Sequence, residues 1–171
     1  MLYWLQKSAN QGYDWAEWGL GQAYMNGTGV PKNYTTAFHW FQKAALKGFE
    51  KAQFNLAICY LNGAGVSKNI KEAINWLTKA GNQGNGDACF LMAGFYNNGE
   101  GVPKNPMLAV TWFKIGAENG NLDCAYFLGV HYYFGSGTVR NTDEAIRWWR
   151  MAAQKGHEDA QKELRNKGIS W

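Results

Sequence analysis

Residues 27–33, GTGVPKN, are the part of the sequence that comes nearest to a chemical motif. A glycine-rich loop can hold phosphate groups with its backbone N–H groups, but it does so directly after a β-strand and at the start of a helix. No strand-like alternation of apolar and polar residues precedes this stretch. It also returns as GAGVSKN at 63–69, GEGVPKN at 99–105 and GSGTVRN at 135–141, and one chain does not need four nucleotide loops. We therefore expect these stretches to be turns between helices.

Residue types that support catalysis or bind metals are present but scattered. The histidines form no HExxH spacing and the cysteines form no CxxC spacing, so we expect no metal centre, no cofactor and three free thiols. These residues are His39, His131, His157, Cys59, Cys89 and Cys124. Carboxylates recur at Asp87, Asp123 and Asp159, each near the expected start of a helix, where negative charge is stabilising. Their regular spacing indicates a structural role, and the sequence predicts no catalytic residues and a protein that is not an enzyme.

Four residue types recur along the chain with a period of 36 residues. The series are Trp4, Trp40, Trp76, Trp112 and Trp148; Gly12, Gly48, Gly84, Gly120 and Gly156; Tyr24, Tyr60, Tyr96 and Tyr132; and Ala37, Ala73, Ala109 and Ala145. Self-similarity at a fixed period of this length is typical of a helical repeat array, in which each unit buries its apolar face only by stacking on its neighbours.

Each period predicts two helices. In the first complete copy, Ala16, Leu20 and Tyr24 form one apolar face of a helix over about residues 15–25. A second helix is expected over about 34–47, with Asn33 at the position where an asparagine side chain caps a helix N-terminus. A glycine just past a helix, such as Gly27, ends it in the left-handed conformation. We expect the periodic tryptophans and tyrosines to pack in the core between helices.

The repeat positions define the expected organisation: one all-α domain over 1–171, folded as a solenoid. Residues 1–12 are a half repeat, 13–48, 49–84, 85–120 and 121–156 are full repeats, and 157–171 are a capping helix and tail. The half repeat lacks its first helix, which leaves Leu2, Tyr3, Trp4 and Leu5 partly uncovered. This indicates either a piece of a longer array or an end that another molecule covers, including self-association through this half repeat.

The unit AQFNLAICYLNGAGVSKNIKEAINWLTKAGNQG, residues 52–84, resembles the Sel-one-like repeat (SLR) family, a relative of the tetratricopeptide repeat. Its pattern, AxxxLGxxYxxGxGVxxxxxxAxxWxxKAAxxG, is matched over almost the whole chain. The resemblance implies a right-handed α/α superhelix, a scaffold or adaptor that binds proteins or peptides, occurrence in bacteria, and usually no catalysis. Cysteine-rich members reported to resemble β-lactamases carry paired cysteines in each repeat, which this chain lacks. A β-lactamase-like hydrolase or a cell-wall glycan binder on the same scaffold is the alternative.

Positions that differ between copies carry the candidate binding surface, because the fold does not dictate them. On the first helix of each repeat, at positions that contact peptides in tetratricopeptide repeats, they change from polar in the first copies to apolar in the last two. We expect a concave groove, lined by these helices, that holds a protein or peptide. Its residues are Gln22, Asn55, Ile58, Asn62, Leu91, Asn98, Phe127, Val130, His131 and Phe134. The alternative is that the apolar members merely pack between neighbouring helices.

Charge and hydropathy narrow the partners further. The net charge of +4, from 17 basic and 13 acidic residues among 171, is too weak to favour nucleic acid. No apolar run approaches the roughly 18–20 residues of a membrane-spanning helix, so we expect no membrane insertion.

The first residues lack the basic start and long apolar stretch of a signal peptide, which favours the cytoplasm unless a leader was removed from a periplasmic protein. Two rows of basic residues are interpreted as solvated ridges, with an acidic partner as the alternative. One row lies in the turns, at Lys32, Lys68, Lys104 and Arg140, and the other at Lys7, Lys43 and Lys79.

Overall fold

The computed structural model describes residues 2–171, and within them the chain forms ten helices and no strand. The prediction of an all-α fold built from helix pairs is therefore confirmed. The helices are α1 (Leu2–Asn10), α2 (Asp14–Asn26), α3 (Tyr34–Leu46), α4 (Glu50–Asn62), α5 (Ile70–Asn82), α6 (Gly86–Asn98), α7 (Pro106–Glu118), α8 (Leu122–Phe134), α9 (Thr142–Gln154) and α10 (Glu158–Asn166). We call α2, α4, α6, α8 and α10 the A helices and α1, α3, α5, α7 and α9 the B helices.

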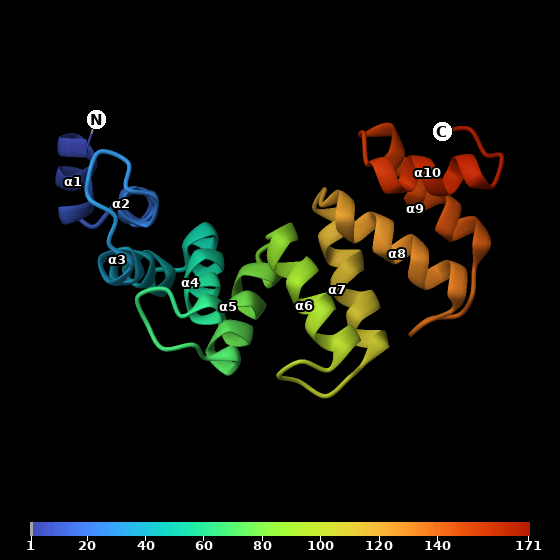
Figure 1. Cartoon of the computed structure of the whole chain (residues 1–171), viewed down its shortest axis with the longest axis horizontal. Coiled ribbons are helices and arrows are strands. Elements are labelled where there is room, and N and C mark those ends of the chain that lie inside the picture. The colour runs from blue at the N-terminus through green and yellow to red at the C-terminus, as the bar shows by residue number, and fades with distance from the viewer. Residues whose placement is uncertain (1) are drawn as a thin grey trace. The chain divides into compact units, whose positions relative to one another are not determined.

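The chain divides into two compact units between Gln83 and Gly84, at a repeat boundary. Unit 1 contains α1–α5 and unit 2 contains α6–α10, and within each unit consecutive helices pack against each other. Figure 1 shows the long turns that join the A and B helices of one repeat, for example between α6 and α7. Each unit is thus a short stack of helix pairs.

Local capping explains where these helices begin and end. The side chains of Asn33, Asn69, Asn105 and Asn141 each accept a hydrogen bond from the backbone N–H three residues on, as the sequence predicts. The glycines that follow the first four A helices all have a left-handed φ, for example 76° at Gly27. The backbone N–H of Asn33 then donates to the Tyr24 carbonyl oxygen at 2.9 Å, which closes the turn.

The second glycine of the GxG motif permits close packing between repeats. A Cβ atom on Gly65 would collide with the Tyr34 backbone at the start of α3, and one on Gly137 would collide with Pro106 at the start of α7. Both glycines also have positive φ values, 75° and 71°. The motif therefore turns the chain and packs it on the preceding repeat, which accounts for its recurrence without a nucleotide.

The core of each repeat forms where a large B-helix residue meets a small A-helix residue. Phe41 is 0% exposed and lies against Gly21, and Trp149 is 1% exposed and lies against Gly129. The indole Nε1 of Trp149 also donates to the Tyr126 carbonyl oxygen at 3.0 Å. Interiors pack as densely as organic crystals, so the sizes of the two facing residues must match.

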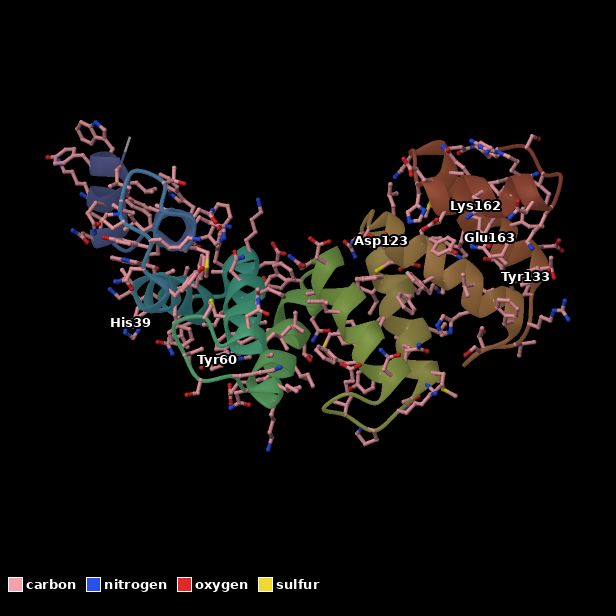
Figure 2. All side chains as sticks on the ribbon, viewed as in Figure 1. His39, Tyr60, Asp123, Tyr133, Lys162 and Glu163 are labelled. Carbon is pink, nitrogen blue, oxygen red and sulfur yellow. The ribbon has the colours of Figure 1, made fainter. Side chains whose placement is uncertain are left out.

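The periodic tryptophans do not share one environment. Trp76 and Trp148 are buried, as predicted, whereas Trp40 and Trp112 are half-buried. Trp4 is 65% exposed, so the prediction of core packing is wrong for this residue, because α1 has no A helix before it among the described residues. At the other end, Lys162 is exposed on α10 (Figure 2), where the full repeats carry an aromatic residue.

Candidate functional site

Three of the predicted groove residues of unit 2 come together around one cavity of about 330 Å³. Leu91 and Asn98 lie on α6 and Phe127 lies on α8, and the two helices are neighbouring A helices of unit 2. We call this cavity the α6–α8 groove. Its lining residues are Phe90, Leu91, Gly94, Phe95, Asn97, Asn98, Glu100, Phe113 and Phe127.

Three phenylalanine rings pack together in the lining of the groove. The Phe113 and Phe127 rings are stacked, with centroids 5.6 Å apart and planes 14° apart, and the Phe90 ring lies 5.7 Å from Phe127. Phe113 is 4% exposed, whereas Phe127 keeps 38% of its surface exposed. Part of the Phe127 ring therefore packs on the core and part stays at the surface, so the packing interpretation holds in part and ligand binding stays a prediction.

The remaining lining residues make the groove open and polar at one side. A Cβ atom on Gly94 would meet no atom within 4 Å, so the groove is open beside this residue. Asn98 donates from Nδ2 to the Glu100 carboxylate at 3.4 Å and accepts from Asn97 at the same distance. Glu100 occupies a turn position where the other repeats have Thr28, Ala64 and Ser136, so its charge is specific to this groove.

The other three predicted residues of unit 2 do not line this groove. His131 is 6% exposed, and its Nδ1 lies 2.7 Å from the Ser136 carbonyl oxygen, so its ring is used to hold the following turn. The expectation that His131 faces a partner is corrected for that reason. Val130 is half-buried, and Phe134 is 72% exposed with its ring against Tyr133.

In unit 1 the predicted polar residues partly bond to each other. The side-chain oxygen Oδ1 of Asn55 accepts from the Trp18 indole N–H at 2.7 Å and from the Gln22 side-chain amide at 3.5 Å. Ile58 is half-buried and Asn62 is exposed. Gln22 also lines a second cavity of about 330 Å³, which the turn after α2 and residues of α1 complete.

The end of unit 1 at α1 is rich in exposed aromatic side chains, as the missing helix predicts. Tyr3, Trp4, Tyr13 and Trp15 are each more than half exposed, and Trp4 and Trp15 line one shallow cavity together with Leu5. Self-association through this face stays a prediction.

The thiols are enclosed in the core. Burial raises the pKa of Cys59 and of Cys89 to about 11, and raises that of Cys124 further. A nucleophilic cysteine needs a lowered pKa and access to substrate, so these side chains are poor candidates for catalysis. Within residues 2–171 no three His, Cys, Asp or Glu side chains gather into a metal-binding group, and no helix is long and apolar enough to cross a membrane.

Histidine and carboxylate side chains at helix starts have structural partners. His157 caps α10, because its Nδ1 accepts from the Ala160 N–H at 3.2 Å while its Nε2 donates to Asp123 at the same distance (Figure 2 labels Asp123). The Asp87 carboxylate accepts from the Asn121 amide at 2.8 Å. For Asp87 and Asp123 this agrees with the structural role that their regular spacing predicts.

Sequence reasoning missed one ion pair, which a buried glutamate forms with an exposed lysine. Lys47 Nζ lies 2.6 Å from the Glu17 carboxylate, whose side chain is 4% exposed, and it also donates to the Gly12 carbonyl oxygen. In the next repeat Gln83 makes the same two contacts, to Gln53 and to the Gly48 carbonyl oxygen. Glu17 and Lys47 are 30 residues apart, as are Gln53 and Gln83, and a comparison of the repeats could have found this shared separation.

Comparisons with known proteins agree with this architecture. The Sel1 repeat model matches residues 2–13, 16–49, 50–85, 86–121 and 122–157.

The c5321 protein of uropathogenic Escherichia coli, a protective antigen displaying an SLR fold, is 30% identical with a TM-score of 0.91. The match covers 99% of this chain and 37% of that one. A Sel1 repeat protein from Oxalobacter formigenes is 36% identical with a TM-score of 0.86, over 94% of this chain and 68% of that one. Helicobacter pylori cysteine rich protein B is 28% identical with a TM-score of 0.59, over 72% of this chain and 94% of that one. No curated protein matches the chain. The chain belongs to the Sel1 repeat family.

Proposed function

We propose that this chain is a non-catalytic scaffold that binds a peptide segment of a partner protein in the α6–α8 groove. Sel1 repeat proteins are generally scaffolds for protein–protein interactions. The observation that supports this site is the apolar hollow beside Phe127, whose ring stays 38% exposed at a position that differs between repeats. The fold does not require an open aromatic surface at this position, because the equivalent residues in unit 1 are Gly19 and Asn55.

The groove suits one or two side chains of a peptide. Its volume of about 330 Å³ is at the lower end of the range for ligand pockets, roughly 300–1,000 Å³. An aromatic or large aliphatic side chain would pack against the Phe127 ring, and aromatic pairs add about 0.5–1.5 kcal/mol beyond the burial of area. The amides of Asn97 and Asn98 offer donors and acceptors for a peptide backbone. Glu100 favours a lysine or arginine beside the apolar anchor.

Gly94 allows the groove to be blocked without removing any core side chain. Because a Cβ atom there meets no neighbour, Gly94→Trp places an indole ring in the groove, while Gly94→Ala leaves most of it open. Replacing a mid-helix glycine with alanine stabilises a helix by about 0.5–1 kcal/mol, so the control variant is not expected to unfold. Phe127→Asp is a weaker test, since Phe127 also stacks on Phe113.

The experiment starts from a displayed library of random peptides selected on the wild-type chain, followed by affinity measurements with the selected peptides. We expect the selected peptides to carry an aromatic or leucine anchor. They should bind the Gly94→Ala variant and should not bind the Gly94→Trp variant, and the helicity of both variants should equal that of the wild type. Equal binding by the wild type and Gly94→Trp, or no saturable binder from the library, would refute the groove as the binding site.

A further inference from the structure

Unit 1 carries the whole net positive charge of the chain. Residues 1–83 contain eight lysines, no arginine and four carboxylates, which gives a formal charge of +4. Residues 84–171 contain nine basic and nine acidic residues, which gives a formal charge of zero. One of the four carboxylates of unit 1, Glu17, is buried against Lys47, so the exposed surface of unit 1 is basic.

Three of these lysines repeat at one position of the B helices of unit 1, and each lies over a tryptophan of its own helix. We call these three the lysine row. The distances from the Nζ atom to the ring centroid are 5.3 Å for Lys7 over Trp4, 4.4 Å for Lys43 over Trp40 and 4.0 Å for Lys79 over Trp76. All three lysines are exposed.

The family pattern has a lysine at this position, but a repeat can form without it. A lysine in the last turn of a helix interacts favourably with the helix dipole, and this alone could explain one such residue. Unit 2, however, has Ile115 and Met151 at the same repeat position, and both pack on the hydrophobic core. The same helix ends are thus built without a positive charge in unit 2, so the stacking of helices does not depend on the lysine row.

The lysine row is also available for binding. None of its three ammonium groups forms an ion pair with a carboxylate of residues 2–171. The tryptophan rings restrict the lysine side chains and so lower the entropy that a partner would have to remove on binding.

We propose that the lysine row binds an acidic segment of a partner protein. Arginine is the preferred residue for phosphate and nucleic-acid recognition, because its planar guanidinium forms paired hydrogen bonds, and unit 1 contains none. Acidic membrane surfaces are bound by clusters of about 4–8 basic residues next to one another. The lysine row instead offers single charges, one in each successive repeat, which matches carboxylates spaced along a polypeptide.

The fold sets the spacing that such a segment needs. Packed helices lie roughly 8–10 Å apart, so B helices separated by one A helix lie at most about 20 Å apart. An extended chain covers about 3.3 Å per residue. Acidic residues about six positions apart would therefore reach neighbouring lysines, and a segment of roughly 13–18 residues would reach all three.

The test uses two 18-residue peptides of equal composition, one with a Glu-Glu pair every six residues and one with all six glutamates at one end. Binding is measured to the wild type, to the row variant Lys7→Gln/Lys43→Gln/Lys79→Gln, and to a control variant, Lys32→Gln/Lys68→Gln/Lys71→Gln. The control loses the same charge from exposed positions of the same unit. Circular dichroism melting of each variant confirms that the fold is retained.

We expect the spaced peptide to bind the wild type about tenfold more tightly than it binds the row variant, as three exposed ion contacts allow. The control variant should bind almost as the wild type does, and added salt should weaken binding because exposed charges are screened. Equal losses in the two variants, or equal binding of the two peptides, would overturn the proposal by showing that only net charge matters. Stronger binding to single-stranded DNA or to phosphatidylserine vesicles would overturn the choice of partner.

Discussion

Replacing Gly129 by alanine would place a methyl group against the indole ring of Trp149. The added Cβ would lie 2.5 Å from Nε1 and 2.6 Å from Cδ1 of that ring. Trp149 is 1% exposed, and its Nε1 donates to the Tyr126 carbonyl oxygen, so the ring cannot move away without losing that hydrogen bond. In the second repeat the equivalent positions hold Ala57 and Leu77, a larger A-helix residue with a smaller B-helix partner.

This geometry sets the expected changes in the free energy of unfolding. Alanine gains about 1 kcal/mol of helix propensity over glycine, but overpacking costs about 1–3 kcal/mol and the threatened hydrogen bond about 1 kcal/mol. We therefore expect Gly129→Ala to lower the free energy of unfolding by about 1–3 kcal/mol. Trp149→Leu alone leaves a cavity and should cost about 2–4 kcal/mol, somewhat below the cost of Trp→Ala. The double variant recreates the Ala57 and Leu77 pair and should be about 1–3 kcal/mol more stable than the two single losses predict.

Urea denaturation of the wild type, both single variants and the double variant measures this coupling directly. A coupling energy below about 0.5 kcal/mol is expected for sites that do not share a contact, and finding it here would refute the packing described for unit 2. A Gly129→Ala variant that is more stable than the wild type would refute it as well.

Three further predictions concern the charges and thiols. Glu100→Lys should change the peptides selected on the α6–α8 groove from basic to acidic residues beside the anchor, and an unchanged selection would exclude Glu100 from recognition. Lys47→Ala leaves the buried Glu17 carboxylate unpaired and should cost about 1–3 kcal/mol, less than a fully buried pair would, because the Lys47 side chain is 42% exposed and water screens the pair. Lys47→Gln/Glu17→Gln, which copies Gln83 and Gln53, should restore most of this loss in the same denaturation assay. A double variant as unstable as Lys47→Ala would contradict the reasoning. Burial raises the pKa of Cys59 and Cys89 from 9.0 to about 11. Between these values the unfolded chain binds fewer protons than the folded chain, so the free energy of unfolding should fall as the pH rises from about 9 to 11. A Cys59→Ala/Cys89→Ala variant should show a smaller fall, and an equal fall would assign it to other groups.

The helices and their ends were predictable because their signals are local. Gly27 and Asn33 fix the end of α2 and the start of α3 through their own backbone and side-chain geometry, and both helices lie within one residue of the expected bounds. The period of 36 residues then repeats these signals, so one correct repeat predicts the others.

The open surfaces were harder to predict because they depend on which neighbours cover a position. Phe127 and His131 lie one helical turn apart on α8, yet His131 turns back to the Ser136 carbonyl oxygen and Phe127 remains at the surface. Trp4 shares its repeat position with the buried Trp76, but the described chain has no helix to cover it. A repeat pattern describes the average environment of a position and cannot show these differences.

The binding site is tested most directly by nuclear magnetic resonance of the ¹⁵N-labelled wild-type chain with a peptide selected from the library. The groove predicts that the largest shifts of backbone amide resonances occur at Leu91, Gly94, Asn98 and Glu100 and saturate with the measured affinity. Shifts that concentrate on other surfaces and leave Gly94 unchanged would contradict the account.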